Sequence, residues 1–239
     1  MLNGTNQFVL HFLDHITIEI FGNFKILNIK EILWDWNGTL IDDASLCVDI
    51  LNQLLTAYGS NSITLNYYRN HFSFPIADFY KRISLPCTGL DFDELSIRFI
   101  SEYRCRWTDC LLQPNTNNII KNLSDRGIKQ SILSAGNQKD VENFVNHFFP
   151  DHFFDKIIGT NNIKAEGKVE LGSKFFSNSN LDAHEILMIG DTLHDLEVGN
   201  EIGCRTLLYT KGHNSKAVLS RSDGQTIDDL MEVTNYLHH

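Results

Sequence analysis

The stretch "EILWDWNGTLIDD", from Glu31 to Asp43, decides the fold class of this chain. A short apolar run ends on the carboxylate of Asp35, and an Asn-Gly-Thr turn with two further acids follows it. An apolar run that is bounded by turn residues is typical of a buried strand. Turn chemistry alone does not explain an acid that stands between two tryptophans. Asp35 is therefore a candidate functional residue.

Four later apolar runs have the same character as the first. They are "KQSILSAG" (129–136), "DKIIGT" (155–160), "HEILMIGD" (184–191) and "CRTLLYTKG" (204–212). Between the runs lie segments in which apolar residues recur every three or four positions, as in amphipathic helices. These segments are 114–127, 137–149, 167–180 and 193–203. Strands that alternate with helices predict an α/β fold, a Rossmann-like parallel sheet core with helices on both faces.

This alternation is interrupted after the first strand, between Ala44 and Leu112. That segment contains consecutive helix-like stretches and no convincing buried strand, and it is too long for an ordinary loop. We therefore expect an all-α cap domain at 44–112, inserted into a core made of 1–43 and 113–239. Residues 1–29 precede the alternation and form an N-terminal extension of the core, with the pattern of a hairpin around Gly22 and Asn23.

The overall charge limits the class of partner. The 239 residues carry a formal net charge of -10, which argues against nucleic acid because a polyanion needs a surplus of Lys and Arg on one face. A small anionic substrate stays compatible with this charge if local cations or a metal bind it. The chain has no apolar run of about 18 residues, which argues against a membrane partner. An odd number of cysteines without a C-x-x-C pair and the lack of a signal-like start favour a cytoplasmic protein.

Polar residues gather where the predicted strands end. In an open parallel sheet ligands bind beyond the carboxyl ends of the strands, so these residues are the candidate site. They are Asp35, Asn37, Ser134, Asp191 and Asp195, with Ala135 and Gly136 next to Ser134, and Lys168 lies ahead of the strand at 184–191. A carboxylate can attack phosphorus, Mg²⁺ held by carboxylates lowers the repulsion between the two anions, and a lysine and a hydroxyl bind phosphoryl oxygens. The set suits phosphoryl chemistry on a small phosphorylated metabolite.

Four motifs in order, "DWNGTL", Ser134, Lys168 and "GDTLHD", resemble those of the haloacid dehalogenase superfamily, in the branch of phosphoglycolate phosphatase-like enzymes. The resemblance extends from about Ile32 to Leu230 and places a helical cap at 44–112. It implies Mg²⁺-dependent hydrolysis of a small phosphomonoester through an aspartyl-phosphate intermediate.

The same resemblance assigns a role to each site residue. Asp35 is the expected nucleophile and metal ligand, and Asn37 offers its backbone carbonyl to Mg²⁺. Asp191 is the expected direct metal ligand and Asp195 a secondary one. Ser134 and Lys168, with the neighbouring Ala135 and Gly136, are expected to bind the phosphoryl group.

Asn37 departs from the family pattern. Phosphatases of this family carry an aspartate there, which protonates the leaving oxygen and later activates water, and an amide cannot exchange protons in that way. Three explanations stay open. A slower phosphatase obtains its proton from water, His194 or a cap residue; the chemistry needs no acid; or the protein is a regulatory protein that binds a phosphorylated ligand with little turnover.

Overall fold

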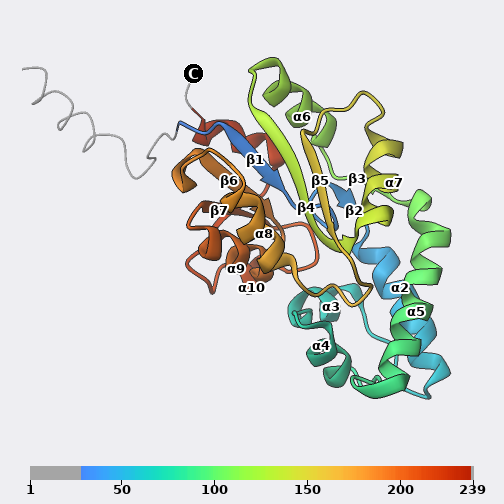
Figure 1. Ribbon diagram of the computed structural model, residues 1–239. Helices are drawn as coiled ribbons and strands as arrows, with labels where there is room; N and C mark the ends of the chain where they lie inside the picture. The colour runs from blue at the N-terminus through green and yellow to red at the C-terminus, as the bar shows by residue number, and fades with distance from the viewer. Residues whose placement is uncertain (1–27, 238–239) are drawn as a thin grey trace, which may run out of the picture.

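The computed structural model describes residues 28–237, so most of the predicted hairpin around Gly22 and Asn23 lies outside the described residues. A six-stranded parallel sheet has the order β5-β4-β1-β6-β7-β8 (Figure 1). Its strands are β1 (Glu31–Trp34), β4 (Lys129–Asn137), β5 (Lys156–Thr160), β6 (Ile186–Gly190), β7 (Arg205–Tyr209) and β8 (Gln225–Ile227). The predicted parallel sheet is confirmed.

The central strand β1 is apolar on both sides, as a sheet covered on both faces requires. Ile32 and Trp34 point into the larger core, whereas Leu33 packs into a second cluster with Phe175 and Val198. Helices α8 and α9 cover the face of Leu33, and α6 and α7 cover the other. The helices and helical turns that follow residue 113 are α6 (Thr116–Asp125), α7 (Gln138–Phe148), α8 (Lys168–Ser177), η2 (Ala183–Glu185), α9 (Leu193–Ile202), α10 (Lys216–Leu219) and η3 (Leu230–Tyr236). The predicted helices on both faces are confirmed.

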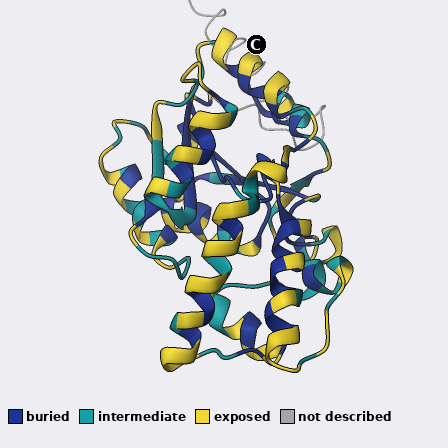
Figure 2. Ribbon diagram, turned by 90° about the vertical axis from the view of Figure 1, so that its right-hand side faces the viewer, coloured by how far each residue is buried: buried dark blue, intermediate teal, exposed yellow. Residues whose placement is uncertain are grey.

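A helical insertion follows the loop after β1, between the first two strands of the sheet along the chain. Its helices are α2 (Ala44–Ala57), α3 (Leu65–His71), α4 (Ile76–Arg82) and α5 (Gly89–Arg106), followed by the short turn η1 (Trp107–Asp109). They lie beyond one end of the sheet (Figure 1), and their buried residues face inward, away from the exposed outer surfaces (Figure 2). The insertion begins and ends on an antiparallel pair of two-residue strands, β2 (Ile41–Asp42) and β3 (Leu111–Leu112). The division into a core and a cap domain stays a prediction.

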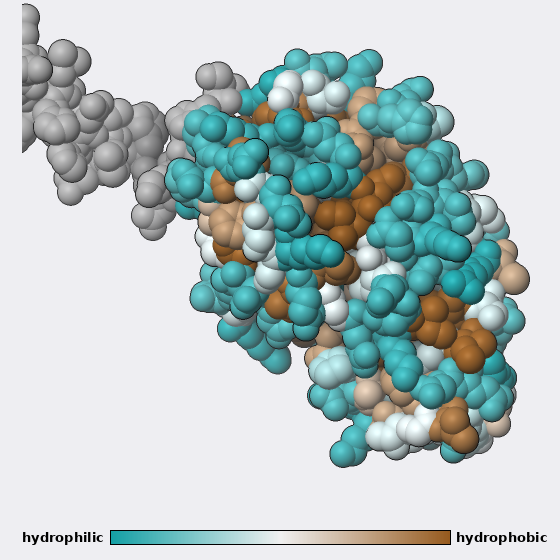
Figure 3. All heavy atoms as spheres, in the orientation of Figure 1, coloured by the Kyte–Doolittle hydropathy of each residue, from teal (hydrophilic) through white to brown (hydrophobic). Residues whose placement is uncertain are grey.

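The strand order locates the site. From β1 the chain proceeds to β4 and β5 on one side of the sheet, and then to β6, β7 and β8 on the other. The order therefore reverses beside β1, where open α/β sheets form their ligand crevice. Elsewhere, in the view of Figure 3, hydrophobic surface occurs as separate areas bordered by hydrophilic side chains. None of the helices within 28–237 combines the length and apolar character needed to cross a bilayer.

Candidate active site

Asp35 directly follows β1 and is buried. Its backbone N–H donates to Ile189 O at 2.8 Å, which fixes it beside β6. Thr39 Oγ1 lies 3.1 Å from Asp35 Oδ2 and 2.8 Å from Asp191 Oδ1, so one hydroxyl can donate to either carboxylate. The Asn-Gly-Thr turn thus returns Thr39 to the strand end, between two of the predicted site residues.

Lys168 is the first residue of α8, and its side chain is only 2% exposed. Its ammonium contacts Asp35 Oδ1 and lies 2.6 Å from Asp195 Oδ1. Burial alone would lower the pKa of Lys168, but the carboxylates of Asp195 and Asp35 raise it above its usual range. In this structure the lysine therefore holds two carboxylates, including the predicted nucleophile.

The acidic turn after β6 is organised by Asp195. Its Oδ2 accepts the backbone N–H groups of Asp191 (3.1 Å) and Thr192 (2.9 Å) and the Thr192 hydroxyl (2.8 Å). This is a capping box at the start of α9, where an acid in the first turn also opposes the positive end of the helix dipole. Since its other oxygen bonds Lys168, Asp195 has a structural task in addition to the predicted secondary metal contact.

The donor set fits a hard divalent cation. Asp35, Asp191 and Asp195 each offer an oxygen, and these atoms lie within 4.8 Å of one another. Burial raises the pKa of Asp35, although Lys168 opposes this effect, and burial raises the pKa of Asp191 to about 6. Three carboxylates against one ammonium leave excess negative charge, and oxygen ligands of this kind suit Mg²⁺.

The predicted phosphate-binding residues lie at the end of β4. The register of the pairing with β5 shifts between Leu133 and Asn137, which marks an irregularity in this part of β4. Ser134 Oγ accepts the Gly136 N–H at 3.0 Å and lies 3.5 Å from Asn37 Oδ1. Ser134, Ala135 and Gly136 all line the same pocket as Asp35 and Lys168. The structure brings these candidates together.

Asn37 has a fixed amide orientation. Its Nδ2 donates to Asp43 Oδ2 at 2.7 Å and to Tyr103 Oη at 2.9 Å, and Tyr103, on α5, donates to the same Asp43 oxygen at 2.7 Å. Both partners accept hydrogen bonds, so the nitrogen end of the amide faces them and Oδ1 faces Ser134. Position 37 therefore presents an acceptor, not a donor, to the predicted phosphate site.

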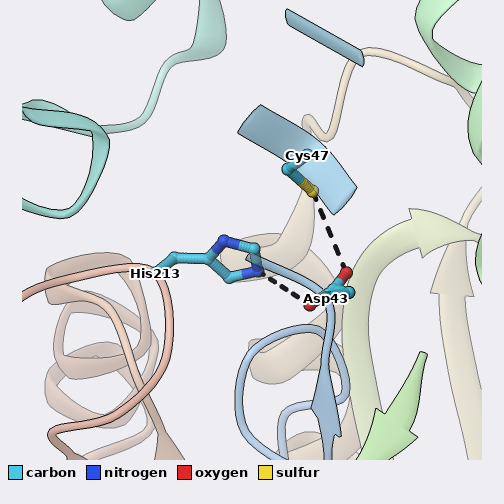
Figure 4. A group of neighbouring side chains, drawn as sticks. All are labelled: Asp43, Cys47 and His213. Carbon is cyan, nitrogen blue, oxygen red and sulfur yellow. Dashed lines mark hydrogen bonds and ion pairs between the residues drawn. The ribbon is translucent and has the colours of Figure 1, made fainter. Parts of the chain in front are cut away.

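Asp43 is the centre of a second buried group (Figure 4). Gly38 N–H donates to Asp43 Oδ1 at 2.9 Å, and His213 Nε2 lies 3.2 Å from the same oxygen. Cys47 Sγ points at Oδ2 from α2 at 4.0 Å, and Tyr68 Oη lies 2.9 Å from His213 Nδ1. The group joins the β1 loop, the helical insertion and the loop after β7.

Asp43 and His213 form an ion pair. Burial alone would raise the pKa of Asp43, but His213 lowers it below its usual range. Burial alone would lower the pKa of His213, but Asp43 raises it to about 9. The imidazole is therefore charged at neutral pH.

The sequence analysis did not single out Thr39, Asp43, Tyr68, Tyr103 or His213. His213 follows the end of β7, so the strand-end rule that found Asp191 also applies to it. Asp43 is buried while its neighbour Asp42 is exposed, a distinction that depends on the path of β2. The two tyrosines enter from the insertion, and no local pattern indicates which of its side chains point at the core.

The parallel sheet gathers three carboxylates and a lysine at its point of reversal, an arrangement suited to phosphoryl chemistry. A family model described as haloacid dehalogenase-like hydrolase matches residues 32–209. The chain belongs to this family of hydrolases, and the family indicated by the motifs is confirmed.

Named relatives agree with this family. The phosphoglycolate phosphatase of Aliivibrio fischeri is 25% identical over 219 residues, which cover 84% of this chain and 93% of that protein. An uncharacterised hydrolase of Saccharomyces cerevisiae is 25% identical over 131 residues, which cover 53% of this chain and 60% of that protein. A haloacid dehalogenase-like family hydrolase from Streptococcus pneumoniae has a TM-score of 0.73 at 22% identity, with 87% of this chain and 98% of that chain covered, a similarity that shows the fold.

Proposed function

We propose that the protein is a Mg²⁺-dependent phosphatase that hydrolyses a small phosphomonoester through an aspartyl-phosphate on Asp35. The observation that carries this proposal is the placement of Asp35, buried between Lys168 and the acidic turn at the reversal point of the sheet. A carboxylate there can act as a nucleophile that splits one difficult displacement into two easier ones.

The chain's own groups orient the nucleophile, and the ammonium of Lys168 opposes the rise in the pKa of Asp35 that burial causes. Lys168 contacts Asp35 Oδ1, and the Thr39 hydroxyl lies within reach of Oδ2, so both oxygens have neighbouring donors before substrate binds. Asp35, Asp191 and the backbone carbonyl of Asn37 would hold Mg²⁺, with Asp195 in support. When bound, Mg²⁺ supplies positive charge that offsets the repulsion between carboxylate and phosphate.

The last part of β4 would provide the phosphate contacts. Ser134, Ala135 and Gly136 line the pocket, and Ser134 Oγ lies 3.5 Å from Asn37 Oδ1. Oriented donors of this kind bind phosphoryl oxygens and stabilise charge that develops in the transition state. Because Asn37 Oδ1 is an acceptor, it can orient an attacking water but cannot supply a proton.

A direct test compares Asp35→Asn with wild type. We expect Mg²⁺-dependent phosphate release from small phosphomonoesters, abolished by chelation, and a loss of about 10³-fold or more in kcat for the variant because the nucleophile is gone. Asp42→Asn, an exposed acid of the same stretch, is the matched control. A covalent phosphate on Asp35, detected by mass after a rapid acid quench, would identify the intermediate. Retained turnover in Asp35→Asn would remove the proposed mechanism.

Asn37 has no titratable group that could act as general acid or base, which favours a second candidate, a protein that binds a phosphorylated ligand and does not turn it over. Calorimetry with the same phosphomonoesters separates the two. Mg²⁺-dependent binding without phosphate release would support the binding protein.

A further inference from the structure

The pocket above Asp35 has an apolar outer wall. The lining side chains that come from α4 and its preceding loop, from α5 and from α7 are largely aromatic or aliphatic. They include Phe72, Phe74, Ile76, Phe99, Ile100 and Phe144. Such a wall stabilises the apolar part of a ligand, while the polar floor of Asp35 and Ser134 takes its phosphate.

The basic side chains that line this pocket already face carboxylates. Lys164 pairs with Asp93 at 2.6 Å, and the imidazole of His194 lies with Nδ1 2.8 Å from Glu197 Oε2. Lys168 and His213 are held by acids of the site itself. Within residues 28–237 no arginine lines the pocket. A second anionic group on the substrate, such as a carboxylate, would therefore find no unpaired cation in the pocket lining with which to form an ion pair.

The proton donors around position 37 are also committed. The amide nitrogen of Asn37 and the hydroxyl of Tyr103 both donate to Asp43. The two ring nitrogens of His213 lie against Asp43 and Tyr68. These groups therefore stabilise one another and leave the oxygen that departs from phosphorus without a proton source among them.

We propose that the substrate is an aryl phosphate, an ester whose aromatic ring packs against the apolar wall and whose phenolate leaves without being protonated. This inference rests on the proposed phosphatase function. Phenols ionise near pH 10, whereas the pKa values of alkyl alcohols lie closer to that of water, about 15.7. Of these two ester classes, the aryl ester therefore loses less when general acid catalysis is missing.

The two steps balance without an acid at position 37. Asp35 forms a bond to phosphorus as the bond from phosphorus to the aryl oxygen breaks, and the phenolate leaves with that electron pair. Water then adds to phosphorus, and the electrons of the aspartyl bond return to Asp35. The attacking water releases one proton to solvent, and the phenolate takes up one proton from solvent, so the protons balance.

A set of matched esters tests the substrate class. Phenyl phosphate has an aromatic ring and an acidic leaving group. Benzyl phosphate has an aromatic ring but an alkyl leaving oxygen, and cyclohexyl phosphate has an alkyl leaving oxygen and no aromatic ring. We expect kcat/KM for phenyl phosphate to exceed that for benzyl phosphate by at least about 10²-fold, with cyclohexyl phosphate and phosphoglycolate slower still. Phosphoglycolate or benzyl phosphate turned over as fast as phenyl phosphate would overturn this inference and leave the phosphatase intact. No release from any ester would overturn the phosphatase function itself.

Two isoleucines of α5 give a matched pair of variants for the apolar wall. Ile100 lines the pocket, while Ile97 is 55% exposed on the same helix. Ile100→Ala is expected to raise KM for phenyl phosphate about tenfold and to leave KM for the small ester methyl phosphate unchanged, because lost apolar contact costs affinity only for the ring. Ile97→Ala should change neither value. Equal effects of the two variants, or of one variant on both esters, would refute contact between ring and wall.

His194 is the pocket side chain that is tested as an alternative proton donor to the leaving oxygen. It lines the pocket with its ring stacked on Phe74, the centroids 4.6 Å apart. The inference expects His194→Gln to leave the ratio of phenyl to benzyl phosphate turnover unchanged. A selective loss of benzyl phosphate turnover would assign the acid to His194 and overturn the acid-independent step.

Discussion

The contact between Asn37 and Asp43 requires that one of the two side chains be neutral, because 2.7 Å separates Nδ2 from the carboxylate oxygen. Two carboxylates at this distance would share one proton and raise the pKa of the pair. Position 37 lacks the expected acid, and Asp43, six residues later, places an acid in contact with the Asn37 side chain. The carboxylate of Asp43 therefore explains why position 37 carries an amide and not a second carboxylate.

Asn37→Asp alone is therefore expected to lower the free energy of unfolding by about 1–3 kcal/mol, since it replaces a buried hydrogen bond with two opposed acids. Adding Asp43→Asn should restore most of this loss, because the exchanged pair again has one amide and one carboxylate. Urea unfolding of the four proteins in the cycle measures the coupling. Additive effects of the two changes would show that the contact does not determine the residue at 37.

The exchanged double variant should also gain turnover of alkyl phosphates. A carboxyl group at 37 can protonate the leaving oxygen, an effect that is typically about 10²- to 10⁴-fold. Benzyl phosphate should gain more than phenyl phosphate, whose leaving group hardly needs the proton. Steady-state kinetics on the two esters checks this, and an equal gain on both would contradict it.

The Asp43–His213 pair predicts a pH-dependent contribution to stability. The pKa of His213 is raised from 6.5 to about 9, so its contribution is complete below pH 6.5 and is lost as pH rises through 9. A shift of this size corresponds to about 3 kcal/mol. In chelator, the stability difference between wild type and His213→Gln should shrink by about this amount over that range. A pH-independent difference would show that the imidazole is not charged in the native state.

At the scale of elements, α9 is held close to β7, and this contact fixes the acidic turn at the start of the helix. A Cβ atom on Gly199 would lie 1.8 Å from Thr206 Oγ1, a buried hydroxyl without a hydrogen-bond partner in the described structure. Only glycine at 199 allows this approach. The position of Asp195 therefore depends on a glycine one turn further along the same helix.

Gly199→Ala should destabilise the protein by about 1–3 kcal/mol through overpacking. Thr206→Ala in the same chain should recover most of the loss, because it removes both the clashing oxygen and its unmet hydrogen bond. Thermal unfolding compares these variants with Asn200→Ala, an exposed neighbour on α9. Failure of the second change to rescue the first would place the strain elsewhere.

The five strands predicted from the sequence could be recognised because each contains a short apolar run bounded by turn residues. The strands β2, β3 and β8 were missed because two or three residues carry no period. Predicted site residues such as Asp35 and Asp191 follow strand ends, where topology alone brings them together. Asp43 and Tyr103 were missed because their contact joins a loop to α5, 60 residues away, and depends on tertiary packing.

At the scale of the whole molecule, a net charge of -10 and a buried cluster of acids oppose folding in the absence of a cation. Salt bridges between elements offset part of this repulsion, for example Arg104 of α5 with Asp140 of α7 at 2.8 Å. Such exposed pairs contribute little each. A bound divalent cation should therefore stabilise the native state.

Mg²⁺ at about 100 times its Kd should add about 2.7 kcal/mol to stability. For a domain of this size we expect a rise of about 5–10 °C in Tm. Asp191→Asn should abolish the rise, whereas Asp125→Asn, an exposed acid on α6, should keep it. Differential scanning fluorimetry at constant ionic strength measures both. An equal rise in both variants would indicate general charge screening instead of a site.

The buried turn also determines how the protein ages. In an unfolded chain, an asparagine before glycine is prone to deamidation, because the next backbone nitrogen can reach the amide carbon without steric hindrance. In the native fold Gly38 N–H donates to Asp43 Oδ1 at 2.9 Å, and the Asn37 amide is held by the same carboxylate. Native protein is thereby protected, and each excursion to the unfolded state risks converting Asn37 into aspartate. The chain would then refold with a carboxylate from deamidated Asn37 next to that of Asp43. The fraction of deamidated Asn37 therefore increases with the time that the protein has spent unfolded.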